Sequence, residues 1–209
     1  MTERPLTAYL VRHARSVGNT SGRVQGWLDL PLDDLGRRQA ERLADRFRGW
    51  RFDALYSSPL ARAADTARAV AAVTGTDIHY DPRLREYNMG AFSGMTGEEI
   101  QSFLSGSGLS PRDEYEWVAP GGESAQETYD RTRAFAWDVV RRHPGQTVMV
   151  VSHAGALGAM ISAMLGLPPA RRHPFGFGNT SVAKVIHDPH GRWRLRSLND
   201  LCHLDGGDQ

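Results

Sequence analysis

The chain of 209 residues has a single cysteine, Cys202, and a single lysine, Lys184. One cysteine excludes an intramolecular disulfide and any metal site built from several thiolates. The 25 basic residues, nearly all arginine, and the 24 acidic residues leave a formal net charge of +1. This balance excludes the large electrostatic footprint with which a protein binds nucleic acid or an anionic membrane surface.

Signals for secretion or membrane insertion are missing as well. Residues 1–9 have neither the cationic start nor the apolar core of a signal peptide. The stretch from Val148 to Leu167 carries no charged residue other than His153 and is long enough to cross a bilayer. However, Ser152-His153 interrupts it, and Val148 to Val151 is typical of a buried strand that leads into a helix. We therefore expect a soluble, cytoplasmic protein.

Short apolar runs alternate with longer helical patterns, and no repeat or linker separates them. Capping residues predict where helices begin, and glycines predict where two of them end. The predicted strands are residues 8–11, 54–56 and 149–152, followed by a hairpin of residues 182–187 and 193–198. Helices are predicted to begin at Asp33 or Asp34, Ser58, Thr96, Ser124 and the residue after His153. Two of these helices are predicted to end at Gly75 and Gly166. This order predicts a single α/β domain over residues 1–209, in which helices cover both faces of a mostly parallel central sheet as a three-layer sandwich. We expect the tail from about residue 205 to be disordered.

Three of the predicted strands end in polar residues, namely Arg12-His13, Ser57-Ser58 and Ser152-His153. Ligands of such sheets bind beyond the carboxyl ends of the strands, so we expect these residues to form one site. Arg62, on the helix after Ser58, and Glu86, just after another predicted strand, extend the set.

Two arginines, two histidines and a carboxylate suit phosphoryl transfer. A guanidinium makes two bonds to phosphate oxygens, whose negative charge must be met by fixed donors. A neutral imidazole is a nucleophile near pH 7, and a carboxylic acid can protonate the leaving oxygen. The dipeptide Arg-His alone carries no signal because it occurs three times, and we interpret Arg142-His143 and Arg172-His173 as structural.

Short motifs follow one another in order along nearly the whole chain. They are Leu10 to His13 with Ser16 and Asn19, Gln25 to Leu32, Ser57 to Arg62 with Thr66-Ala67, Leu84 to Glu86 with Gly90 and Gly94, Pro120 to Ser124, Val151 to His153, and Asn179 to Ser181. Each motif is weak alone, but the ordered set resembles the histidine phosphatase superfamily, in its phosphoglycerate mutase-like branch.

The resemblance implies a role for each matching residue. His13 is implied as the nucleophile that becomes phosphohistidine, and Glu86 as the proton donor that later activates water. The expected phosphoryl ligands are Arg12, Arg62 and His153, and the expected substrate contacts are Asn19, Gln25, Gly26, Tyr87 and the backbone N–H of Ala154. No metal or other cofactor is expected. Reasoning from the residues leaves Glu98, Glu99 and Glu123 open as alternative acids.

Three residues depart from the family pattern. Ala14 and Ala154 replace common glycines, which is tolerable unless the backbone there needs a positive φ. Arg15 stands where the family commonly has Glu or Gln. It is either a solvated surface charge or a contact to a second anionic group of the substrate.

The missing basic residues favour a hydrolase over a mutase. The mutases of this family hold a carboxylate with an arginine directly after the catalytic glutamate, where this chain has Tyr87, and with a lysine where it has Met95 to Glu98. We therefore expect a phosphomonoester hydrolase acting on a small phosphorylated metabolite, with phosphoglycerate mutase as the alternative. A phosphate-binding module without turnover is a third hypothesis, disfavoured because His13 and Glu86 are both present.

We further expect Thr96 to Trp117 to form a lid over the site. We also expect the protein to be a homodimer.

Overall fold

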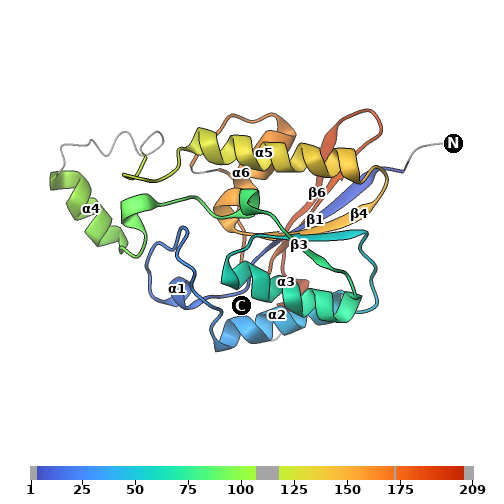
Figure 1. Cartoon of the computed structure of the whole chain (residues 1–209), viewed down its shortest axis with the longest axis horizontal. Helices are drawn as coiled ribbons and strands as arrows, with labels where there is room; N and C mark the ends of the chain where they lie inside the picture. Colours follow the sequence, from blue (N-terminus) through green and yellow to red (C-terminus); the bar gives the residue numbers. More distant parts are fainter. Residues whose placement is uncertain (1–3, 107–117, 172, 205–209) are drawn as a thin grey trace.

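A six-stranded sheet in the order β3–β2–β4–β1–β5–β6 runs through the computed structural model, which describes residues 4–106, 118–171 and 173–204. Helices α5 and α6 cover one face of the sheet, and α2 and α3 cover the other (Figure 1). The predicted three-layer sandwich is confirmed. Residues 107–117 of the expected lid and 205–209 of the expected tail lie outside the described residues.

Four strands of the sheet are parallel, and a hairpin completes it. The parallel strands are β1 (Leu6–Arg12), β2 (Ala54–Ser57), β3 (Ile78–Tyr80) and β4 (Thr147–Ser152), and the antiparallel pair is β5 (Val182–His187) and β6 (Trp193–Asp200). Arg12 lies opposite Ser152, and Ser57 lies opposite Val151. The carboxyl ends of β1, β2 and β4 therefore meet at one edge, as the sequence predicted.

The helices mostly begin where the capping residues predicted. They are α1 (Val17–Thr20), α2 (Asp34–Arg46), α3 (Ala61–Thr74), α4 (Gly97–Gly106), α5 (Ala125–Arg142) and α6 (Ala154–Leu165), with short 3-10 turns at Pro82–Leu84, Gly90–Phe92 and Cys202–Leu204. Asp33 accepts a hydrogen bond from the Gly36 N–H at the start of α2. Thr96 with Glu99 and Ser124 with Glu127 form reciprocal capping bonds at α4 and α5.

One predicted helix start is wrong. Helix α3 begins at Ala61 with Leu60 as its N-cap, and not at Pro59 after Ser58. The Ser58 hydroxyl contacts the imidazole of His153 at 2.8 Å. Ser58 therefore lies in the site, and the chain enters the helix only after Leu60.

Alternating side chains of the central strands fill two separate cores. On one face, Leu10 and Val150 pack with α5 and α6, and on the other, Val11 and Met149 pack with α2 and α3. The uncharged stretch from residue 148 to 167 is thus divided between β4 and α6. Among the described residues, no helix combines the length and the apolar character needed to cross a membrane.

Candidate active site

A cavity of about 240 Å³ opens at the carboxyl edge of the sheet. It is lined by Arg12, His13, Asn19, Val24, Gln25, Gly26, Arg62, Glu86, Tyr87, Met89, Gly155 and Arg171. The structure thus brings together most of the residues that the sequence predicted for the site. Within the described residues, no group of three or more His, Cys, Asp or Glu side chains is arranged to hold a metal ion.

His13 follows β1 directly and is almost completely buried. Its Nδ1 lies 2.7 Å from the carbonyl oxygen of Ala14. Because a carbonyl oxygen can only accept a hydrogen bond, Nδ1 carries the proton and Nε2 keeps a free lone pair. Burial, and after it the charges of Arg62 and Arg12, hold the pKa of His13 well below its usual value. A neutral imidazole with its Nε2 unprotonated is a competent nucleophile.

His153 lies beside this nucleophile, with ring centroids 5.0 Å apart. Its Nε2 contacts the Ser58 hydroxyl, whose oxygen already accepts the Leu60 N–H. A hydroxyl can donate to one partner while its oxygen accepts from another, so Ser58 can donate to Nε2, and the proton of the neutral imidazole then sits on Nδ1. Burial, and after it the charge of Arg62, also holds the pKa of His153 well below its usual value. In this tautomer His153 supplies a neutral N–H donor beside His13.

Arg62 and Arg12 are fixed by backbone carbonyl groups. Arg62 is 1% exposed and donates to the oxygens of Leu28 and Gly26 at 2.8 and 2.9 Å. Gly26 has φ +51, a conformation that favours glycine and that turns this carbonyl toward Arg62. Arg12 donates to the oxygen of Phe177 at 2.5 Å.

Three buried donors at this point have no acceptor among the described residues. They are Nε of Arg12, Nε of Arg62 and Nδ1 of His153. Buried polar groups in proteins are almost always hydrogen-bonded, so such a cluster of donors is suited to an anion. Two guanidinium groups and one imidazole N–H around the His13 nucleophile match the oxygens of a phosphoryl group.

Glu86 is held at the N-terminus of α6. Its carboxylate accepts the N–H groups of Ala156 at 3.0 Å, Gly155 at 3.2 Å and Tyr87 at 2.9 Å. A Cβ atom on Gly155 would lie 2.5 Å from the Glu86 Oε1, so only glycine lets the carboxylate come this close to the helix. The side chain lines the cavity at a fixed place, as a proton donor requires.

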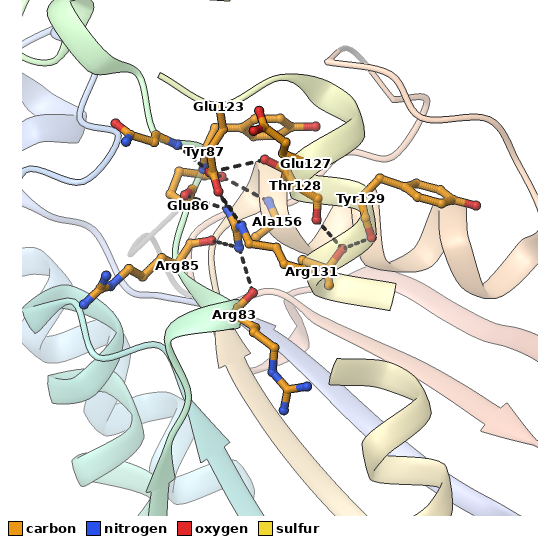
Figure 2. A network of polar contacts seen from close by, with 12 residues as sticks. Arg83, Arg85, Glu86, Tyr87, Glu123, Glu127, Thr128, Tyr129, Arg131 and Ala156 are labelled. Atoms are coloured by element: carbon orange, nitrogen blue, oxygen red, sulfur yellow. Dashed lines mark hydrogen bonds and ion pairs between the residues drawn. The ribbon is translucent and has the colours of Figure 1, made fainter. Parts of the chain in front are cut away.

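Hydrogen bonds from Arg131 hold the backbone of the segment that carries Glu86 (Figure 2). The Arg131 guanidinium donates to the carbonyl oxygens of Arg83, Arg85 and Glu86 at 2.7 to 2.9 Å. It also bonds both carboxylate oxygens of Glu123 at 2.9 and 3.0 Å. Glu123 is thereby committed to Arg131, and it does not line the cavity.

Replacing Arg131 with glutamine should destabilise the protein by about 3 kcal/mol, because the partly buried Glu123 carboxylate loses its ion pair and three carbonyl groups lose a charged donor. The matched control is Arg48→Gln, since Arg48 and its partner Asp45 are both 65% exposed. An exposed pair of this kind contributes less than about 0.5 kcal/mol. Urea unfolding measures both values, and equal losses in the two variants would contradict this role of Arg131.

Of the other expected acids and substrate contacts, some line the cavity and others do not. Glu98 and Glu99 begin α4 and do not line the cavity. Asn19 and Gln25 do line it, and each accepts a hydrogen bond from Ser16 through its amide oxygen. Their NH2 groups are therefore the ends that can donate to a substrate.

The cavity lining does not include Arg15, Ala154 or His153. The His153 ring is fully buried beside His13, which does line the cavity. Arg15 instead pairs with Asp33 at 2.8 Å, because the N-cap carboxylate of α2 lies beside it. Ala154 is the first residue of α6, and the N–H groups that bond Glu86 belong to the next two residues. Ala14 and Ala154 have no positive φ, so their methyl groups are tolerated.

The two buried histidines make stability depend on pH. Because each has a folded-state pKa well below 6.5, the unfolded chain binds protons below pH 6.5 that the folded chain does not. The free energy of unfolding should therefore fall as the pH falls, by up to about 1.4 kcal/mol per histidine between pH 7.5 and 5.5. Urea unfolding at the two pH values measures this decrease. In His13→Gln the free energy of unfolding should decrease by about 1.4 kcal/mol less than in the wild type. Identical losses would contradict the neutral state of His13.

Sequence reasoning missed two arginines here. Arg131 acts through backbone carbonyl groups, and Arg171 reaches the cavity from the loop after α6. Neither lies in a motif or at the end of a strand. The proximity of Arg171 to Arg172-His173, which we interpreted as structural, was the only available signal.

Comparison with known proteins places the chain in a family. Residues 8–201 match the histidine phosphatase superfamily (branch 1). Phosphoserine phosphatase 1 of Hydrogenobacter thermophilus is 38% identical over 202 residues, which cover 93% of this chain and 92% of that protein. A probable phosphoglycerate mutase, GpmB, of Yersinia enterocolitica is 34% identical over 215 residues, which cover 96% of this chain and 95% of the relative.

Solved structures agree with these sequence matches. A mycobacterial glucosyl-3-phosphoglycerate phosphatase superposes with a TM-score of 0.83 at 32% identity, covering 94% of this chain and 99% of the other. The ordered motifs, the sheet topology and the matched residues thus point the same way, and the chain belongs to the histidine phosphatase superfamily.

Proposed function

We propose that this protein is a metal-independent phosphomonoester hydrolase that acts on a small phosphorylated metabolite through a phosphohistidine at His13. The observation that carries the proposal is the tautomer of His13, whose Nε2 is unprotonated in a cavity with two buried arginines. The related phosphoserine and glucosyl-3-phosphoglycerate phosphatases support a hydrolase.

In the first step, the Nε2 lone pair of His13 attacks phosphorus and forms the N–P bond. The bond from phosphorus to the ester oxygen breaks, and Glu86 transfers its proton to that oxygen, so an alcohol leaves. Arg12, Arg62 and the Nδ1–H of His153 hold the phosphoryl oxygens as their charge redistributes. The Ala14 carbonyl stabilises the imidazolium-like ring through Nδ1–H.

In the second step, the Glu86 carboxylate accepts a proton from water, whose oxygen attacks phosphorus. The N–P bond breaks, inorganic phosphate leaves, and His13 returns to its neutral form. One water is consumed for each ester, and Glu86 ends protonated as it began.

A phosphoglycerate mutase is the alternative, because a relative carries that name. Tyr87 supports the hydrolase: it replaces the arginine expected of a mutase, and its hydroxyl donates to the carbonyl oxygen of Ala170 at 3.1 Å. Single-domain organisation, a cytoplasmic location and a homodimer stay predictions from the sequence.

The test is phosphate release from p-nitrophenyl phosphate in excess EDTA. The proposed chemistry uses only protein groups, so turnover should be the same with and without the chelator. Loss of turnover in EDTA that returns with added metal would contradict a metal-independent mechanism. Isomerisation of phosphoglycerate without net phosphate release would favour the mutase.

A further inference from the structure

Trp27 is a large aromatic side chain that the packing of the fold does not require. Its ring is 37% exposed, and it is part of none of the hydrophobic cores that the described residues form. Its Nε1–H donates to the backbone carbonyl oxygen of Glu86 at 2.7 Å, between residues 59 positions apart. The guanidinium of Arg85 lies over the same ring, 4.9 Å from its centroid. The Trp27 ring is therefore fixed against the backbone of the segment that carries the acid.

The backbone on both sides of Trp27 is bound to a ligand of the phosphoryl group. The carbonyl oxygens of Gly26 and Leu28 both accept hydrogen bonds from the Arg62 guanidinium. The Asp29 carboxylate accepts the first N–H of helix α3, which also carries Arg62. Because Arg62 is almost completely buried, the segment around Trp27 is held at a fixed place relative to it.

Trp27 therefore connects the group that binds phosphate with the group that donates the proton. Arg62 holds phosphoryl oxygens, and Glu86 must reach the ester oxygen on the same phosphorus atom, so their separation has to be maintained. Arg131 also donates to the Glu86 carbonyl oxygen, at 2.9 Å, and a carbonyl oxygen can accept both bonds. Arg131, however, extends from α5. The bond from Trp27 instead fastens the Glu86 backbone to the segment that Arg62 holds.

We propose that Trp27 is a positioning residue for the general acid, and that its ring N–H keeps Glu86 within reach of the ester oxygen of a substrate bound at Arg62. This inference rests on the proposed phosphatase function. Proton transfer requires hydrogen-bond distance between the acid and the leaving oxygen, and a small misplacement lowers the rate of that step. Loss of the N–H should therefore slow esters that need the proton more than esters that do not.

The test uses two esters of similar size, phenyl phosphate and p-nitrophenyl phosphate. Phenolate is the more basic leaving group, so its departure depends more on the acid. Trp27→Phe keeps an aromatic ring and removes the N–H donor. In this variant kcat/KM for phenyl phosphate should fall about 3- to 10-fold, as for the loss of one hydrogen bond, and kcat/KM for p-nitrophenyl phosphate less than about 2-fold. The matched control is Trp50→Phe, which should change neither value, because Trp50 is 44% exposed and does not line the active-site cavity.

A double variant tests whether the effect passes through the acid. In a Glu86→Gln background there is no acid to position, so adding Trp27→Phe should leave the ratio of the two kcat/KM values unchanged. If Trp27 only supported the surrounding loop, Trp27→Phe would slow both esters equally in the otherwise wild-type protein, and this result would overturn the proposal. A ratio that still changes in the Glu86→Gln background would overturn it as well.

Thermal unfolding verifies that Trp27→Phe folds. If it does not fold, the same ratios are measured with a tryptophan analogue, incorporated at position 27 alone, in which sulfur replaces the ring N–H and the double ring is kept. A wild type that hydrolyses neither ester would refute the phosphatase function itself, whereas an active wild type whose ratio is insensitive to Trp27 would overturn only the positioning role.

Discussion

Replacing His13 with alanine should lower the turnover of every phosphomonoester by at least about 10⁴-fold, because among the described residues His13 is the one histidine that lines the cavity and can form the phosphohistidine. The phosphoryl ligands Arg12, Arg62 and His153 remain in this variant, so phosphate and substrate should still bind. Steady-state kinetics with p-nitrophenyl phosphate and O-phosphoserine measure the loss.

The control for this variant is His79→Ala. His79 is an exposed histidine on β3 that does not line the cavity, so its loss should leave turnover close to the wild type. Thermal unfolding verifies that both variants fold. A folded His13→Ala protein that keeps substantial activity would refute His13 as the nucleophile.

Replacing Glu86 with glutamine should slow alkyl phosphates far more than p-nitrophenyl phosphate. An alkoxide is a poor leaving group and needs the proton, which general acid catalysis supplies with a gain of about 10²- to 10⁴-fold. The p-nitrophenolate ion leaves without protonation, so its formation should be much less affected. The measurement is kcat/KM for glycerol 3-phosphate and p-nitrophenyl phosphate in both proteins.

This comparison also corrects for structural disturbance. Glutamine would present an NH2 group to the N–H donors of α6, and such a clash slows both esters alike. Glu99→Gln, an exposed change at the start of α4, serves as the matched control. Equal slowing of the two esters by Glu86→Gln would mean that another group is the acid.

Much of the site was predictable because its residues are adjacent to regular elements. Arg12, His13 and His153 lie at the ends of strands whose apolar runs are plain in the sequence, and parallel pairing then brings these ends together. Reasoning from the residues placed Glu86 in the set, but only the family resemblance singled it out as the acid. Its contact with α6 joins residues 69 and 70 positions apart and leaves no local signal. The pairing of β4 with β1 likewise joins segments that lie far apart in the sequence, so no local pattern predicts it.

The points at which the sequence prediction was wrong or incomplete have physical reasons. The Ser58-Pro59 pair has the form of a helix start, but the Ser58 hydroxyl bonds His153, and nothing local to residues 58–62 reveals that partner. Arg15 pairs with Asp33, which was itself correctly predicted as a helix cap, and the pairing depends on how α2 packs. Arg131 and Arg171 bond backbone carbonyls 45 to 48 residues away, and such contacts leave no pattern of side chains in the sequence.

The most direct test of the account is to trap the covalent intermediate. Wild-type enzyme mixed with O-phosphoserine is quenched in alkali during turnover, because a phosphohistidine survives alkali and is lost in acid, and the phosphorylated residue is located by mass spectrometry of the peptides. The account predicts one phosphoryl group, on His13, that disappears in His13→Ala. A phosphoryl group on another residue, or full turnover with no phosphoenzyme formed at any time, would contradict it.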